Sequence, residues 1–264
     1  MAEKNKVIID PPLRNIEGVS YKAAQKIEEQ LKKGRRYFGS SGASMTYQFS
    51  SPEYDNVEGL KKEVAKEMLE GERDTTTFLK KWIKDKPNVV MIESVSVPDW
   101  DKEQELNEEY GIIDTPDTDH VLLIGSEVLL IDTKRWKKKK TYSVSDDGAA
   151  LMTNKQFAGG EILMKESIYS WLDYLDEDAS ITGIVCINTE EATVIRNKNW
   201  YTEPFRLVEL DRFEELLDEK WKMTEDEEKE HINTTLASQI IVQCIKPFDV
   251  YSKVFQMDTL RDFK

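Results

Sequence analysis

Two apolar runs separated by a Gly-Ser pair constrain the fold of this chain more than any other feature. Residues 121–124 and 128–131 contain only Val, Leu and Ile, and the Gly-Ser pair lies between the runs at 125–126. Apolar runs of this length around a two-residue turn are typical of a β-hairpin. If 125–126 form the turn, Asp119 lies directly opposite Asp132 on the neighbouring strand.

Charged side chains are expected to converge at one end of this hairpin. Directly opposed residues in antiparallel strands have Cβ atoms about 4.5–5.5 Å apart and point to the same face of the sheet. Lys134 shares that face with Asp132, because side chains two residues apart along a strand point the same way. We therefore predict a cluster of Asp119, Asp132 and Lys134, which suits a divalent metal ion and a reaction on phosphate.

The composition restricts the class of protein. Hydrophobic residues make up 39% of the 264 residues and charged residues 33%, which indicates a packed core under a heavily solvated surface. A net charge of −14 argues against a general nucleic-acid coat protein. A nuclease needs only a local cationic surface, and the densest positive run, with Arg135, Lys137 and Lys138, follows the hairpin. This run favours contact with a polyanion; the alternative is that its lysines only discourage pairing at a strand edge.

Features of secreted or membrane proteins are not found in the sequence. Cys186 and Cys244 are the only cysteines, so neither a zinc-type spacing nor a disulfide framework exists. The N-terminus lacks the apolar stretch of a signal peptide, and no segment reaches the length of a membrane span. We expect a soluble protein of a reducing cytoplasm that contacts no membrane, with Cys186 as a buried thiol in a strand.

Helical and extended patterns alternate along the chain, which predicts an α/β sheet with helices on its faces. Gly71, inside the long helical pattern, is expected either to separate two helices or to mark a close approach of backbone. Asp211 is expected to cap the helix that follows it. The predicted helices cover 21–36, 57–83, 161–175, 211–221 and 232–245; the other strands cover 89–97, 181–187, 192–195 and 205–210, with a second hairpin over 141–157.

Asp119 together with Asp132-Thr133-Lys134 resembles the D…(D/E)xK signature of the PD-(D/E)xK nuclease superfamily. The order of the surrounding elements is most similar to the nuclease-related domain (NERD) group of that superfamily. In that group a helix with a Gly-Glu pair precedes the hairpin, and Gly71-Glu72 looks like this pair. The resemblance covers roughly residues 69–217, and its later parts match the basic-aromatic segment 135–137, the turn 146–148, a helix with a pair of strands, and the strand and helix over 205–217.

The resemblance implies a restriction-endonuclease-like fold, in which a mixed sheet with a central β-hairpin is flanked by helices. It implies a nuclease domain over residues 57–221. We expect residues 1–56 to form an N-terminal helical accessory segment and residues 222–264 to form a C-terminal acidic linker and helix.

The resemblance also implies roles for single residues. Mg²⁺, or Mn²⁺ in its place, prefers oxygen ligands and keeps several waters. Asp119, Asp132 and the Thr133 carbonyl are expected to bind it, with Glu72 in direct or water-bridged contact. Lys134 is expected to orient the attacking water or to stabilise the developing negative charge.

Two positions depart from the pattern of the group. Asp132 stands where the group often has Glu, which shortens the side chain that reaches the metal. In the group, the helix after the basic segment often opens with Asn-Pro and a nearby Gln. The corresponding stretch here is residues 159–166, and Lys165 is expected to stand in for the Gln at the catalytic site. Arg135, Lys137 and Lys138 are expected to contact the substrate.

The resemblance therefore predicts a Mg²⁺-dependent nuclease that hydrolyses phosphodiester bonds of DNA. One alternative is a catalytically inactive binding or scaffold protein of the nuclease fold, which reaches a protein partner or a second copy of itself through its terminal helices. In that case Asp132 and Lys134 form an ordinary ion pair at a strand end, and Glu72 is a solvated helix residue. A further alternative is a nuclease that acts on RNA, because both substrates share the phosphodiester.

Overall fold

The computed structural model describes residues 19–39, 59–97, 117–135, 141–144, 150–153, 156–161, 163–175, 180–189, 192–195, 205–224 and 232–244. Helices and strands alternate along these ranges. The helices are α1 (Val19–Lys32), α3 (Gly59–Ile83), α5 (Leu163–Leu175), α6 (Phe213–Met223) and α8 (Thr234–Gln243), and the short 3₁₀ helix η2 (Leu210–Arg212) precedes α6. The strands are β1 (Tyr37–Phe38), β2 (Val89–Ser96), β3 (Asp117–Ile124), β4 (Glu127–Lys134), β5 (Thr141–Val144), β6 (Ala150–Thr153), β7 (Gln156–Glu161), β8 (Ile181–Ile187), β9 (Thr193–Ile195) and β10 (Phe205–Glu209).

These strands form one large and one small sheet. The large sheet has six strands in the order β1-β2-β3-β4-β8-β10, and the small sheet has four in the order β7-β6-β5-β9. The large sheet is mixed: β3 is antiparallel to both of its neighbours, β2 and β4, whereas β1, β8 and β10 each run parallel to a neighbour. The predicted α/β class with a mixed sheet is therefore confirmed.

The central hairpin is also confirmed. Ile124 pairs with Glu127 and His120 with Ile131, which is the register that a two-residue turn at 125–126 dictates. Gly125 has φ 61°, as the first central residue of a type II′ turn requires, and this backbone conformation favours glycine. The hairpin lies in the middle of the large sheet, where its apolar runs have almost no exposed surface.

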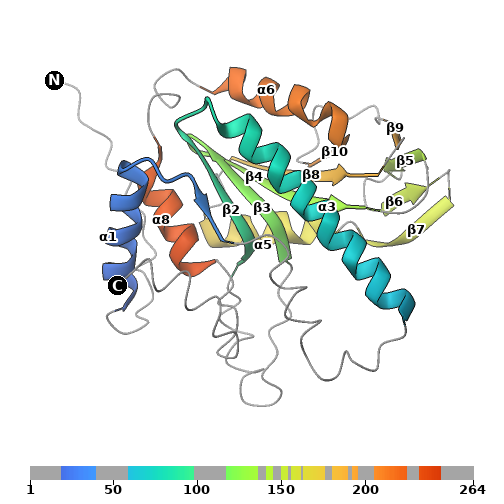
Figure 1. Cartoon of the computed structure of the whole chain (residues 1–264), viewed down its shortest axis with the longest axis horizontal. Coiled ribbons are helices and arrows are strands. Elements are labelled where there is room, and N and C mark those ends of the chain that lie inside the picture. The colour runs from blue at the N-terminus through green and yellow to red at the C-terminus, as the bar shows by residue number, and fades with distance from the viewer. Residues whose placement is uncertain are drawn as a thin grey trace, which may run out of the picture.

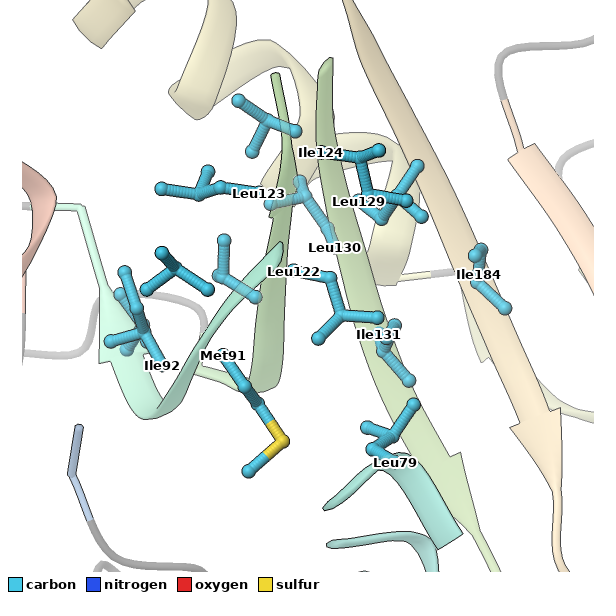
Figure 2. Packing of buried hydrophobic residues seen from close by; sticks show 14 of the residues in the cluster. Leu79, Met91, Ile92, Leu122, Leu123, Ile124, Leu129, Leu130, Ile131 and Ile184 are labelled. Carbon is cyan, nitrogen blue, oxygen red and sulfur yellow. The ribbon is translucent and has the colours of Figure 1, made fainter. Parts of the chain in front are cut away.

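Helices cover the faces of the large sheet, which explains why its central strands are apolar on both sides. Figure 1 shows α3 crossing in front of the strands and α5 behind them, and both helices contact β4. Leu79 of α3 belongs to the same buried cluster as the central strands, and Figure 2 shows part of this packing. The labelled members are Leu79, Met91, Ile92, Leu122, Leu123, Ile124, Leu129, Leu130, Ile131 and Ile184.

α6 packs beside α3 and reaches the turn end of the hairpin. The rings of Phe78 and Phe213 stack with centroids 5.6 Å apart. At the turn end, Lys220 Nζ lies 2.6 Å from Glu127 Oε1 and donates to Thr182 Oγ1 at 2.9 Å. These contacts join the start of β4 and β8 to α6.

The terminal elements share the core of the sheet. α1 packs against α8, and β1 extends the large sheet by pairing with β2. Ile27 and Leu31 of α1 and Ile240 of α8 are members of the same buried cluster as the central strands. α1 and α8 thus bury apolar surface against each other and the sheet; the division of the chain into three parts stays a prediction.

Three details of the predicted elements were wrong. Asp211 does not cap α6: it lies in η2, and the helix begins at Phe213 after Arg212, whose side chain makes no capping hydrogen bond. Glu161 does not start α5 but ends β7, which pairs with β6. β8 and β9 do not form a pair of strands, because β8 pairs with β4 and β10, whereas β9 pairs with β5 in the small sheet.

Other predictions were correct or fall outside the described ranges. The antiparallel pairing of β5 with β6 confirms the second hairpin, although its turn at 146–148 is not described. Cys186 is buried and free, which confirms the predicted core thiol, and Cys244 is buried and free as well. None of the helices in the described ranges is both long and apolar enough to cross a membrane.

Candidate active site

The end of the hairpin opposite its turn brings Asp119 onto β4. Pairing between β3 and β4 runs from the turn to His120 and Ile131. Just beyond the last pair, Asp119 Oδ2 accepts a hydrogen bond of 2.6 Å from the backbone N–H of Thr133. The carboxylate of Asp119 is therefore held against the segment that carries Asp132 and Lys134.

Lys134 and Asp132 form a close ion pair on the same strand. Lys134 Nζ lies 2.9 Å from Asp132 Oδ1 and 2.8 Å from Oδ2, so the ammonium faces both carboxylate oxygens. The two side chains are 28% and 18% exposed, which leaves the pair open to solvent on one side. This geometry agrees with the expectation that side chains two apart on a strand share a face.

Glu72 of α3, which is buried, adds a third carboxylate to this environment. Burial, followed by the charges of Asp132 and Glu72, raises the pKa of Asp119 well above its ordinary value, against the opposing effects of Lys134 and the Thr133 N–H. Asp119 retains some accessible surface, but the surrounding protein dominates its electrostatics. The charges of Asp132 and Glu72 thus both act on the carboxyl group of Asp119.

The ammonium of Lys134 is the counter-charge of these acids. Burial acts to lower the pKa of Lys134, but the charges of Asp132, Asp119 and Glu72 outweigh it and raise the pKa above its ordinary value. Lys134 therefore remains protonated at neutral pH. In this state the ammonium carries a positive charge and donates hydrogen bonds, and it cannot act as a general base.

Gly71 allows α3 to approach the end of β4. Of its two expected roles, close approach is the correct one, because α3 is continuous from residue 59 to 83. A Cβ at Gly71 would lie 2.8 Å from Cβ of Arg135. The Gly71 carbonyl accepts a hydrogen bond of 2.9 Å from Asn188 Nδ2, while the Asn188 backbone N–H donates to the Lys134 carbonyl at 2.8 Å. Asn188 thus ties the helix that carries Glu72 to the strand that carries Lys134.

Gly71→Ala is expected to destabilise the protein. Replacing glycine by alanine inside a helix normally stabilises it by up to about 1 kcal/mol. Here the new methyl group would meet Cβ of Arg135, which cannot swing away as the end of a long side chain would. Chemical denaturation should therefore give a lower free energy of unfolding for Gly71→Ala than for the wild type. Arg135→Gly removes the opposing Cβ, so the double variant should recover part of the loss; a stabilised single variant would contradict the close contact.

The remaining predicted site residues are placed less fully. Arg135, expected to contact substrate, donates from Nη1 to Asp74 Oδ2 of α3 at 2.5 Å and remains 30% exposed. Lys165 lies in α5, but its side chain is not described. Lys137 and Lys138 lie outside the described ranges. Their predicted roles stay predictions.

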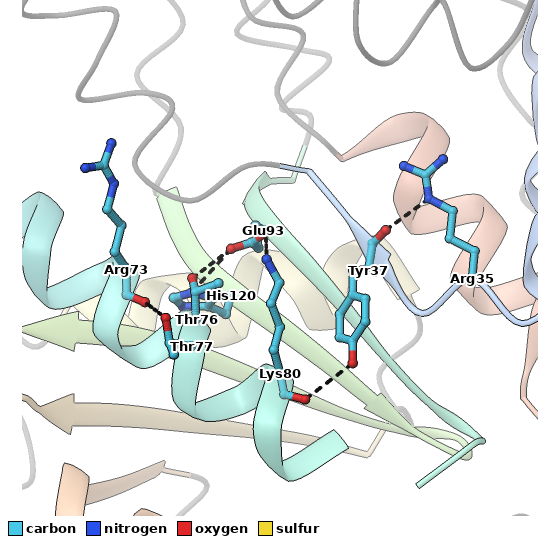
Figure 3. Close-up of polar contacts among 8 residues, drawn as sticks. All are labelled: Arg35, Tyr37, Arg73, Thr76, Thr77, Lys80, Glu93 and His120. Atoms are coloured by element: carbon cyan, nitrogen blue, oxygen red, sulfur yellow. Dashed lines mark hydrogen bonds and ion pairs between the residues drawn. The ribbon is translucent and has the colours of Figure 1, made fainter. Parts of the chain in front are cut away.

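The sequence did not point to a second polar cluster beside the first. Thr76 of α3 contacts both Glu93 of β2 and His120 of β3, and Lys80 reaches Glu93 from the surface (Figure 3). No motif marks these residues. The pairing of Glu93 with His120 across β2 and β3 was the one available signal, and it required the register of that strand pair.

The donor set beside Lys134 fits a hard cation only in part. Among the described side chains, no three His, Cys, Asp or Glu residues are grouped closely enough to hold a metal ion. Mg²⁺ uses few protein carboxylates and keeps most of its waters, so two carboxylates and one backbone carbonyl are a sufficient set. Asp119, Asp132 and the carbonyl of Thr133 are the groups that could make up such a set. A cation near Asp119 would offset the charges of Asp132 and Glu72, which help to raise its pKa.

No protein-family model matches the chain, and no curated protein matches it.

Proposed function

We propose that this protein is a metal-dependent nuclease that hydrolyses phosphodiester bonds of DNA. The observation that carries the proposal is the convergence of Asp119, Asp132 and Lys134 at one end of the central hairpin. The Thr133 N–H holds Asp119 at 2.6 Å, and Lys134 faces both oxygens of Asp132. Two carboxylates and one ammonium on adjacent strands form a compact arrangement for binding a cation and a phosphate group.

The residues divide the chemistry between them. Asp119, Asp132 and the Thr133 carbonyl would hold Mg²⁺ or Mn²⁺, and Glu72 would contact its waters. When bound, the metal would polarise a phosphoryl oxygen and lower the pKa of a coordinated water. Lys134, kept protonated by its acidic neighbours, would stabilise the negative charge that develops on the phosphoryl oxygens.

The order of elements supports a restriction-endonuclease-like fold of the PD-(D/E)xK superfamily. A helix with Gly71-Glu72 precedes the central hairpin, and α5 and β8 follow it. β10 then leads into α6. This order agrees with the NERD-like arrangement expected from the sequence, except that β9 leaves the large sheet for the small one. Lys165 would act at the catalytic site in place of the Gln of the group, and the basic run after β4 would contact the substrate.

One observation favours a second candidate, a nuclease-fold protein that binds a partner without catalysis. The Lys134 ammonium already occupies the position beside Asp132 that a cation would need, and the described residues contain no group of three metal-binding side chains. An inactive descendant would keep such an ion pair as its stable state. Affinity for Mn²⁺ separates the two candidates, because a working site exchanges the ion pair for the metal and a relic does not.

Cleavage of supercoiled plasmid tests the proposed function. The purified chain should convert plasmid DNA to nicked and linear forms with Mg²⁺ or Mn²⁺ and should stop when EDTA is added. Asp132→Asn, which keeps the size of the side chain and removes its charge, should abolish the reaction. Cleavage should also weaken steeply with salt, because DNA would be held through a local basic surface, and such contacts lose affinity as the salt concentration rises. Equal rates for the wild type and Asp132→Asn would refute the assignment.

A parallel reaction on single-stranded RNA distinguishes the two nuclease substrates. The proposal predicts faster metal-dependent cleavage of DNA than of RNA by the same preparation. A reversed preference would leave the site chemistry intact and change the substrate to RNA.

A further inference from the structure

The polar cluster between α3 and the sheet lies next to the proposed metal ligands. We name it the Thr76 cluster, and it consists of Thr76, Lys80, Glu93 and His120. Thr76, Glu93 and His120 are buried, whereas the side chain of Lys80 is 45% exposed. Burying this many polar groups is unfavourable unless they bond to one another.

The hydroxyl of Thr76 is the centre of the cluster. Thr76 Oγ1 donates to Glu93 Oε1 at 2.7 Å and lies 2.8 Å from His120 Nε2. A hydroxyl has only one proton, so the proton between Thr76 and His120 belongs to Nε2, which donates to Oγ1. Lys80 Nζ lies 3.7 Å from Glu93 Oε2 and brings a positive charge to the carboxylate. One hydroxyl thus connects α3 to two strands.

The position of the cluster relates it to the proposed site. Residues four apart on a helix lie on the same face. Glu72 and Thr76 are therefore stacked about one turn apart on α3. Glu93 pairs with His120 across β2 and β3. His120 is the residue directly after Asp119 on β3. Any shift of α3 against β3 would therefore move Glu72 relative to Asp119.

The backbone beside the cluster is constrained as well. Ser94 follows Glu93 on β2 and has φ 54°, a left-handed conformation that is unusual for a residue other than glycine. Ser94 lies between the pairs Glu93–His120 and Val95–Thr118, which places it across from Asp119. Such conformations persist only where the surrounding contacts fix them, and they are frequent at functional sites.

We propose that Thr76 is a positioning residue for the metal site: its hydroxyl fixes the distance between α3, which carries Glu72, and β3, which carries Asp119. This inference rests on the proposed function, because it assumes that these two carboxylates act on one cation. Thr76 acts through Glu93 and His120 and has no chemical role of its own. Its removal should loosen the geometry of the site and weaken metal binding.

Mn²⁺ titration by calorimetry on the full chain tests the proposal. Thr76→Val replaces the hydroxyl by a methyl group of the same size. It should raise the Kd for Mn²⁺ about 10-fold, which is the lower end of the loss of affinity seen when residues that orient metal ligands are replaced. Thr76→Ser keeps the hydroxyl and should bind as the wild type does.

Thr182→Val is the matched control. Thr182 is as buried as Thr76, and its hydroxyl likewise donates to a carboxylate, Glu127 Oε1 at 3.1 Å, but at the turn end of the hairpin. Both valine variants should lose thermal stability, whereas only Thr76→Val should lose affinity for Mn²⁺. A Kd for Thr76→Val equal to that of Thr182→Val would overturn the positioning role while the proposed function stands. A wild type that binds no Mn²⁺ would overturn both.

Lys80→Met decides the question if Thr76→Val does not fold. Lys80 is half-exposed, so the fold should tolerate its loss. Removing a positive charge near acidic groups would by itself tighten Mn²⁺ binding, whereas loosening the Thr76 cluster would weaken it. A higher Kd for Mn²⁺ supports the positioning role, and an unchanged or lower Kd contradicts it.

Discussion

Lys134→Met is expected to abolish DNA cleavage while it tightens the binding of Mn²⁺. The ammonium faces both oxygens of Asp132 at 2.8–2.9 Å, so an incoming cation must break this ion pair. Methionine has a similar length and no charge, which leaves Asp132 free for the metal. The affinity should rise about 5-fold, since a partly exposed ion pair contributes about 1 kcal/mol. The cleavage rate should fall by about 10²–10³-fold, the usual loss when one charge-stabilising donor is removed.

Opposite effects on binding and catalysis separate Lys134 from a residue that only maintains the fold. Asp132→Asn serves as the comparison, because it should lose both Mn²⁺ binding and cleavage. Calorimetry gives the Kd, and plasmid cleavage at saturating Mn²⁺ gives the rate. Wild-type rates for Lys134→Met, or weaker binding of Mn²⁺ by that variant, would contradict the role assigned to the ammonium.

The parts of the structure that depend on short-range patterns could be predicted from the sequence. The hairpin follows from two apolar runs and a glycine at its turn, and its register follows from the turn length alone. Because the register fixes which residues oppose each other, the neighbourhood of Asp119, Asp132 and Lys134 was predictable as well. The link from Gly71-Glu72 to this neighbourhood came only from the family resemblance.

The parts that depend on contacts between distant segments could not be predicted. The pattern of residues 192–195 indicates a strand but does not say that it pairs with β5 rather than with β8. The helix α6 was predicted to begin after a cap at Asp211, but it begins at Phe213 because η2 lies between them. Asp211 followed by a helical pattern gave no sign of η2. Thr76, Glu93 and His120 come from three elements, and their contacts depend on how α3 lies across the sheet.

The unfavourable charge of Asp119 leads to the second large effect: without metal, Asp119→Asn should be more stable than the wild type. Burial and the charges of Asp132 and Glu72 raise the pKa of Asp119, which means that folding opposes ionisation of this group. Asparagine keeps an oxygen that can accept from the Thr133 N–H and removes the repelled charge. The gain should be about 0.5–2 kcal/mol, as for other stabilising substitutions, and thermal unfolding at pH 7 in EDTA measures it.

The dependence of this gain on pH and on metal identifies its cause. A carboxyl group with a raised pKa in the folded state stabilises the fold below its unfolded pKa, and this contribution is lost as the pH rises through the folded value. The advantage of Asp119→Asn should therefore shrink on acidification, when the wild-type carboxyl takes up its proton. Burial, followed by the charge of Lys80, lowers the pKa of His120 to about 3. Acid therefore destabilises both proteins equally through His120, and the difference in stability between them reports on Asp119 alone.

Mn²⁺ at about 100 times its Kd should stabilise the wild type by about 2.7 kcal/mol and leave the variant unchanged. If Asp119→Asn is less stable than the wild type in EDTA at neutral pH, the carboxylates do not repel one another, and the electrostatic basis of the proposed site is lost.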